Sequence, residues 1–149
     1  MMNVPTSEYE DLGRTALEAR KSAYTPYSHF QVGAALLTED GTIFTGGNIE
    51  NAAYTPTNCA ERTAFFKAVS EGKRCFTALA VAGGPEGELP TKFCSPCGVC
   101  RQVMMEFCDP KTFQIVLVKG NGAKDDDFKF YTLEELLPEG FGPAILKRT

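Results

Sequence analysis

The stretch FQVGAALLTEDGTIFT, residues 30–45, joins two apolar segments through the turn sequence Glu39-Asp40-Gly41. An Asp-Gly pair between two such segments is a strong signal for a β-hairpin. Residues 30–37 are mostly apolar, which predicts a strand largely buried on both faces. Residues 42–45 form the return strand, and the chain then reaches Gly46-Gly47-Asn48, where the backbone can bend sharply. We therefore expect this hairpin to lie inside a sheet covered by helices.

Helices and strands alternate around the hairpin. A helix is predicted from about residue 7 to 23, because Ser7-Glu8-Tyr9-Glu10 has capping-box spacing and apolar residues recur at helical intervals from Leu12 to Ala23. Three more helices are predicted: one from the cap Asn58 to the stop Gly72, one opened by Ser95-Pro96, and one after the capping box Thr132–Glu135. Further strands are predicted at residues 76–82, 113–118 and 128–131, with a loop at 83–92. This order predicts an α/β fold, and no linker or internal repeat divides residues 1–149.

Composition excludes several classes of protein. The 149 residues are 43% hydrophobic and 23% charged, as in one globular domain with a core that needs no disulfide bonds. No uncharged apolar run approaches the roughly 20 residues that cross a bilayer, so no membrane partner is expected. The first residues lack a signal-peptide layout, which predicts a cytoplasmic protein. The net charge of −4 and the scattered basic residues argue against a nucleic-acid polymer and favour a small ligand.

Six cysteines point to a metal site, because disulfide bonds belong to oxidising compartments. Two segments stand out: Cys59-Ala60-Glu61-Arg62 and Pro96-Cys97-Gly98-Val99-Cys100. Each is expected at the start of a helix, where Cys97 and Cys100, three positions apart, share one face. Only one histidine, His29, is present, so a transition-metal site must be mostly thiolate, which selects zinc or iron–sulfur.

The spacing favours one zinc held by Cys59, Cys97 and Cys100, with a fourth position open for water, as in catalytic zinc sites. Glu61 would stand beside that water and take and return its proton. Three thiolates bound to Zn²⁺ give the site a net charge of −1, which opposes lowering the pKa of the bound water. Two helix N-termini and the guanidinium of Arg62, hydrogen-bonded to a thiolate, would offset this charge.

Other interpretations of the cysteines stay open at this point. Cys94, Cys97 and Cys100 have a spacing similar to an iron–sulfur run, and Cys94 could also close the zinc site as a fourth ligand. However, the spacing to Cys108 does not fit the bacterial ferredoxin pattern, and Cys59 would have no role. Cys75 and Cys108 are interpreted as small buried apolar residues.

The motif pair Cys-x-Glu and Pro-Cys-x-x-Cys is the signature of zinc nucleobase deaminases. More widely, the sequence resembles the small homotetrameric cytidine deaminases of free nucleosides, within the cytidine and deoxycytidylate deaminase superfamily. The matching stretches are residues 28–35, 47–52, 59–64, 95–102, 135–138 and 141–143.

The resemblance implies a single domain over residues 1–149, a helix–sheet–helix sandwich with a mixed, roughly five-stranded sheet. It also implies a homotetramer with sites shared between subunits and one zinc per chain. Phe30 would pack on the pyrimidine, and Asn48 and Glu50 would hydrogen-bond the ribose hydroxyls. The other substrate-binding residues that it implies are Ala52, Tyr54, Ala60 and Phe141, of which Ala52, Tyr54 and Phe141 would approach a neighbouring subunit's site.

The activity expected from the resemblance is hydrolytic deamination of cytidine and 2′-deoxycytidine to uridine and 2′-deoxyuridine, with release of ammonia, as in pyrimidine salvage. Zinc-bound hydroxide would attack C4, with Glu61 as the proton shuttle. One alternative is deamination of another cytosine-bearing molecule, such as a nucleoside antibiotic or a base in a polynucleotide. An alternative of a different class is a non-catalytic zinc or iron–sulfur protein.

Overall fold

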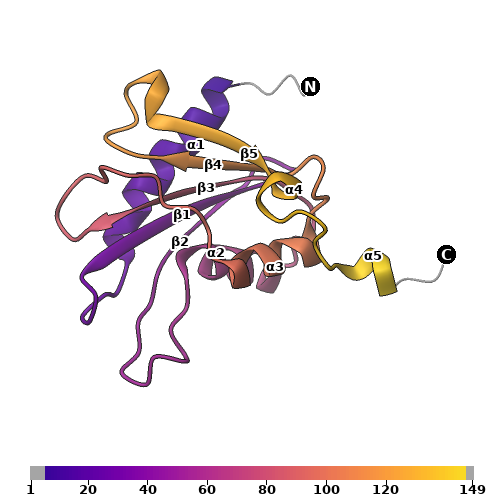
Figure 1. Ribbon diagram of the computed structural model, residues 1–149, viewed down its shortest axis with the longest axis horizontal. Helices are drawn as coiled ribbons and strands as arrows, with labels where there is room; N and C mark the ends of the chain where they lie inside the picture. The colour runs from indigo at the N-terminus through magenta and orange to yellow at the C-terminus, as the bar shows by residue number, and fades with distance from the viewer. Residues whose placement is uncertain (1–5, 147–149) are drawn as a thin grey trace.

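Five strands form one mixed sheet in the order β2-β1-β3-β4-β5 in the computed structural model, which describes residues 6–146 (Figure 1). Neighbouring strands run antiparallel except β3 and β4, which are parallel. The strands are β1 (Phe30–Thr38), β2 (Ile43–Gly47), β3 (Phe76–Pro85), β4 (Gln114–Val118) and β5 (Phe128–Thr132). The helices are α1 (Thr6–Ala19), α2 (Ala60–Ser70), α3 (Gly98–Phe107), α4 (Leu133–Leu136) and α5 (Pro143–Leu146), with 3₁₀ turns η1 (Arg20–Ser22) and η2 (Asp125–Asp127).

Helices cover both faces of the sheet, α1 on one side and α2 with α3 on the other (Figure 1). Alternate residues of each strand point to opposite faces. In β1, Ala35 and Leu37 pack with the α1 core, whereas Ala34 and Leu36 pack with the core formed by α2 and α3. Both faces of the central strands are therefore apolar, which explains the nearly continuous apolar runs in the sequence. The predicted α/β sandwich with a mixed five-stranded sheet is confirmed.

Several predicted helix starts were wrong in detail. α1 already includes Ser7, so this residue is not its N-cap. α2 begins after Cys59, and the Asn58 side chain donates a hydrogen bond to the Thr63 hydroxyl instead of capping the helix. α3 begins after Cys97 rather than at Ser95-Pro96. The Ser95 hydroxyl accepts a hydrogen bond from the Arg101 guanidinium, so it does not cap the helix.

Two further predictions were wrong because they depend on tertiary contacts. β3 continues to Pro85, although residues 83–85 were predicted as loop, because Gly83 and Gly84 pair with Val32 and Gln31 of β1. Cys75 is exposed, whereas Cys108 is buried as predicted.

The capping box at Thr132 and Glu135 is confirmed at the start of α4. No helix within residues 6–146 is both long and apolar enough to cross a membrane.

Candidate active site

Three cysteine sulfurs meet where α2 and α3 begin. Cys59 is the N-cap residue of α2, Cys97 is the N-cap residue of α3, and Cys100 lies in the first turn of α3. The Sγ atoms of Cys59 and Cys97 are 3.7 Å apart, and those of Cys97 and Cys100 are 3.5 Å apart. All three sulfurs lie within 4.8 Å of one another. The fold thus brings together the predicted ligand set from two segments that are distant in the sequence.

The local backbone directs these sulfurs towards each other. Cys59 and Cys97 have extended φ and ψ angles, and neither side chain caps its own helix by a hydrogen bond. The partial positive charge at a helix N-terminus favours the thiolate form. The pKa of Cys59 is lowered to about 5, chiefly because the Cys100 thiol donates a hydrogen bond to its sulfur, with a further contribution from Arg62.

The geometry of the cluster suits zinc. Zinc–sulfur bonds of about 2.3 Å in a tetrahedron place two sulfurs about 3.8 Å apart, close to the separations observed here. No other Cys, His, Asp or Glu of residues 6–146 joins the cluster with a ligand atom. Cys94 is half-buried and its sulfur is not part of this cluster. The described part of the chain therefore offers three ligands, as in catalytic zinc sites, and neither the closed four-ligand site nor the iron–sulfur run.

Glu61 follows Cys59 by two residues and is only 4% exposed. It lies in the first turn of α2, so its carboxyl group is held at the same helix end as the Cys59 sulfur. Burial raises the pKa of Glu61 to about 7, and the negative charge of Cys59 acts in the same direction. A carboxyl group that titrates near neutral pH can both accept and donate a proton during turnover.

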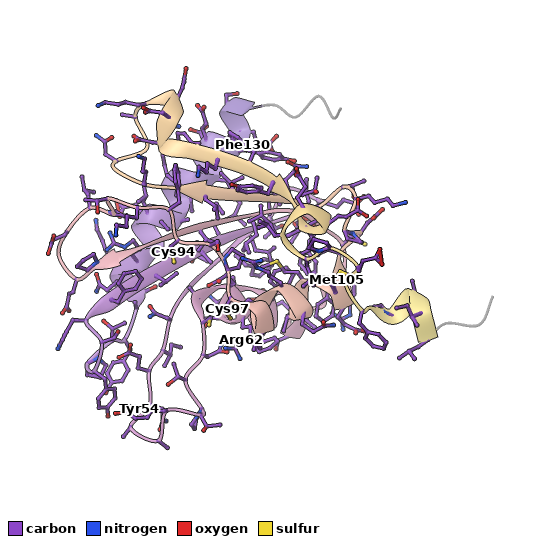
Figure 2. The ribbon with its side chains drawn as sticks, viewed as in Figure 1. Tyr54, Arg62, Cys94, Cys97, Met105 and Phe130 are labelled. Carbon is purple, nitrogen blue, oxygen red and sulfur yellow. The ribbon has the colours of Figure 1, made fainter. Side chains whose placement is uncertain are left out.

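Arg62 lies directly beside the cluster, and Figure 2 shows it next to Cys97. Its Nη2 donates a hydrogen bond to Cys59 Sγ at 3.3 Å. Its Nε is buried and has no hydrogen-bond partner within the described residues. The guanidinium thus brings a full positive charge to a set of sulfurs that carries excess negative charge.

The residues expected to bind the substrate occupy the start of β1 and the loop after β2. Phe30 is the first residue of β1, and its side chain is 40% exposed. Asn48 bridges to the same strand: its Nδ2 donates to the Phe30 carbonyl at 3.0 Å, and its Oδ1 accepts from the Val32 N–H at 2.9 Å. The Glu50 carboxylate accepts from the backbone N–H groups of residues 27 and 28 and from the Ser28 hydroxyl.

The remaining candidates lie in different surroundings. Ala60 is fully buried beside Cys59, but Ala52 and Tyr54 lie on the long loop between β2 and α2. Tyr54 is 73% exposed near the tip of this loop, well away from Cys97 (Figure 2). Phe141 is also exposed, and its carbonyl accepts a hydrogen bond from Gln102 of α3.

Comparison with known proteins places this geometry in a family. Residues 6–116 match the family model described as "Cytidine and deoxycytidylate deaminase zinc-binding region". The chain belongs to the cytidine and deoxycytidylate deaminase family. A protein of Sporosarcina psychrophila named "Cytidine deaminase" is 52% identical over 139 residues, which cover 93% of this chain and 95% of that protein. A "Probable cytidine deaminase" of Dictyostelium discoideum is 49% identical over 93% of this chain and 87% of its own length.

Solved structures agree with the sequence comparison. The crystal structure of cytidine deaminase from Burkholderia pseudomallei superposes with a TM-score of 0.76 at 45% identity, over 89% of this chain and 98% of that chain. As a member of a zinc-binding deaminase family, the chain is an enzyme with a zinc cofactor, and the three-cysteine cluster is compatible with that zinc.

One arginine of this deaminase was not singled out from the sequence. Arg101 of α3 donates hydrogen bonds to the carbonyls of Pro96 and Leu136 and to the Ser95 hydroxyl. It thereby ties the segment before Cys97 to the end of α4. No local sequence signal identifies such a role, because the partners lie up to 35 positions away.

Replacing Arg62 by methionine tests the charge that it brings to the cluster of this deaminase. The variant keeps an unbranched apolar stem but removes the charge and the hydrogen bond to Cys59. We expect zinc affinity or activity to fall about 10- to 100-fold, as for other residues that contact metal ligands. Zinc content after dialysis against a chelator, together with turnover, measures this effect, and an unchanged value for both would contradict the role.

Proposed function

We propose that the chain hydrolyses cytidine and 2′-deoxycytidine to uridine and 2′-deoxyuridine with release of ammonia, within pyrimidine salvage. The observation that carries this proposal is the three-sulfur cluster beside the buried carboxyl group of Glu61. Family membership and curated cytidine deaminases at about half identity support the same reaction. We also propose that residues 1–149 form one catalytic domain.

In this proposal Cys59, Cys97 and Cys100 hold one zinc ion per chain. When bound, zinc supplies the Lewis acidity that makes water nucleophilic near neutral pH. Glu61 accepts a proton from the water that attacks C4 and delivers it to N3 of the base. Glu61 then accepts the remaining proton of the hydroxyl group now on C4 and gives it to the amino group, so that the C4–N bond breaks, ammonia leaves and the C4 carbonyl of the product forms. Its burial beside the cluster holds the carboxyl group in place for both transfers.

Substrate binding is assigned to the groups near the start of β1. Phe30 covers the flat face of the pyrimidine, while Asn48 and Glu50 bind the ribose hydroxyls. The backbone contacts of Asn48 and Glu50 hold both side chains in place before the nucleoside arrives. Ala60 lines the base pocket in this proposal. Ala52, Tyr54 and Phe141 contact the site of a neighbouring subunit.

The test is an assay of the purified protein combined with metal analysis. One zinc per chain and loss of cytidine absorbance are expected. A nucleoside panel with an oligonucleotide separates the alternatives: preference for a nucleoside antibiotic or for the polymer would replace the proposed substrate. A brown protein that contains iron and has no deaminase activity would overturn the proposal.

We further propose a cytoplasmic homotetramer with shared sites. Several large apolar side chains are exposed in the single chain, and such side chains commonly mark protein interfaces. They include Tyr24, Tyr27, Ile49, Tyr54 and Phe141, which are 46–73% exposed. The rings of Tyr27 and Tyr54 also contact each other edge to face, with centroids 6.4 Å apart.

Shared sites predict that activity depends on protein concentration. We expect the turnover per chain to fall when the enzyme is diluted below the dissociation constant of the tetramer, because each site then loses residues from its neighbours. Specific activity measured across a dilution series, beside sedimentation at the same concentrations, checks this. A monomer with full activity would refute it.

A further inference from the structure

Arg20 is a buried cation whose role lies outside the zinc cluster. The residue is 6% exposed and follows α1 in the short turn η1. Its guanidinium donates to four backbone carbonyls: Nε to Gln31 at 2.9 Å, Nη1 to Glu88 at 2.8 Å, and Nη2 to Gly84 at 2.9 Å and to Pro85 at 3.0 Å. Five N–H donors in a planar fork allow one side chain to bind several carbonyls at once.

Close packing of α1 on β1 places Arg20 at this position. A Cβ atom on Gly33 would lie 2.1 Å from the Ala16 carbonyl oxygen and 2.5 Å from the Arg20 nitrogen. Only glycine therefore allows the end of α1 to lie directly against β1. This contact brings the guanidinium under the end of the sheet where β1 begins and β3 ends.

Three of the four carbonyls belong to the strand ends next to Phe30, and the fourth, that of Glu88, belongs to the loop after β3. Phe30 pairs with Pro85, and Gln31 pairs with Gly84, at the last positions of the β1–β3 ladder. Pro85 has no N–H, so it cannot donate to the ladder at the pair that contains Phe30. Arg20 binds this ladder end on the β3 side, while the Asn48 amide binds the Phe30 carbonyl and the Val32 N–H on the β2 side.

The ring of Phe30 lies over the same end of β3. A Cβ atom on Gly83 would be 3.1 Å from Phe30 Cε2 and 2.7 Å from Cys94 Sγ. The ring edge is thus close to Cys94, three residues before the candidate zinc ligand Cys97. A shift of Gly84 or Pro85 would move the surface on which the ring rests.

We propose that Arg20 is a positioning residue that holds Phe30 in the orientation needed to cover the pyrimidine. The inference rests on the proposed function, in which Phe30 packs on the base. Arg20 touches neither the substrate nor the zinc ligands. It acts by binding the Gln31 carbonyl next to Phe30 on β1 and the Gly84 and Pro85 carbonyls at the end of β3. Its contribution is therefore to substrate binding and not to the chemical step.

The test is Arg20→Lys, which keeps the positive charge but cannot bind carbonyls from three segments with one small ammonium group. We expect KM for cytidine to rise about tenfold, with kcat within about twofold of wild type, as for an interaction made equally in the ground and transition states. Zinc content stays at one per chain, because the cysteine cluster is not touched. Arg14→Lys is the matched control, since Arg14 of α1 also donates to a backbone carbonyl, that of Gly122, but makes no hydrogen bond to β1 or β3 among the described residues.

Phe30→Leu distinguishes positioning of the ring from a general loss of structure. If Arg20 acts through Phe30, Arg20→Lys raises KM little further in the Phe30→Leu background. Should Arg20→Lys not fold, Gly84→Ala decides instead, because the added Cβ would lie 3.2 Å from Arg20 Nη2 and 3.0 Å from Pro90 Cα. That variant is expected to raise KM while kcat and zinc content stay unchanged.

An unchanged KM in Arg20→Lys, or in Gly84→Ala where Arg20→Lys does not fold, overturns the inference. An equal rise in KM in the wild-type and Phe30→Leu backgrounds does the same. A parallel fall of kcat and zinc content would likewise assign Arg20 a purely structural role. If the wild-type chain does not turn over cytidine, the proposed function itself fails, and the inference fails with it.

Discussion

Replacement of Glu61 by glutamine is expected to lower kcat for cytidine by about 10²- to 10⁴-fold, the usual contribution of a positioned general acid–base group. Glutamine has nearly the same size and shape, but its amide cannot accept a proton from water and return it to the base. Zinc content is expected to stay at one per chain, because Glu61 is not among the clustered ligands. Steady-state kinetics with metal analysis on the same sample measure both quantities.

A matched control lies at the other end of the same helix. Glu71, the exposed C-cap residue of α2, is far from the cysteine cluster, so Glu71→Gln should leave turnover unchanged. The buried site of Glu61 also accepts a neutral amide without introducing an unpaired charge, so the variant is expected to fold. If Glu61→Gln kept more than about a few per cent of wild-type activity, the assigned proton transfers would be wrong.

Replacement of Cys97 by serine is expected to release zinc and abolish turnover. Cys97 is the exposed N-cap residue of α3, and serine is a better N-cap than cysteine, so the helix itself should not be weakened. The stability that zinc binding adds would be lost, about 4 kcal/mol of unfolding free energy when free zinc is roughly 1,000 times its dissociation constant. Metal analysis and thermal unfolding with and without added zinc measure the loss.

A second exposed cysteine, Cys75, provides the matched control for Cys97→Ser. Cys75 is exposed and lies outside the cluster, so Cys75→Ser should keep zinc, activity and the stabilisation by zinc. Zinc retained at one per chain in Cys97→Ser would show that Cys97 is not a ligand. Loss of zinc in both variants would instead indicate a general effect of removing a thiol.

Local patterns in the sequence were sufficient for most of the fold. The β1–β2 hairpin, the helices that follow Cys59 and Cys97 and the edge strand β5 were predicted because each depends on residues within a few positions of one another. The spacing of Cys97 and Cys100 is likewise local, but only the fold brings Cys59, 38 positions before Cys97, to the same cluster. The predicted starts of α2 and α3 were less accurate, because the side chains of Asn58 and Ser95 form other hydrogen bonds instead of capping these helices.

The tertiary structure alone decided the features that depend on distant partners. The burial that raises the pKa of Glu61, the exposure of Cys75 and the extension of β3 to Pro85 all follow from which segments pack together. Arg20 is the clearest case: in the sequence it is one scattered basic residue, yet its carbonyl partners at positions 84, 85 and 88 lie more than 60 residues away. Residue type and spacing determine local conformation and metal-binding chemistry, whereas solvent access and long-range hydrogen bonds exist only after the chain has folded.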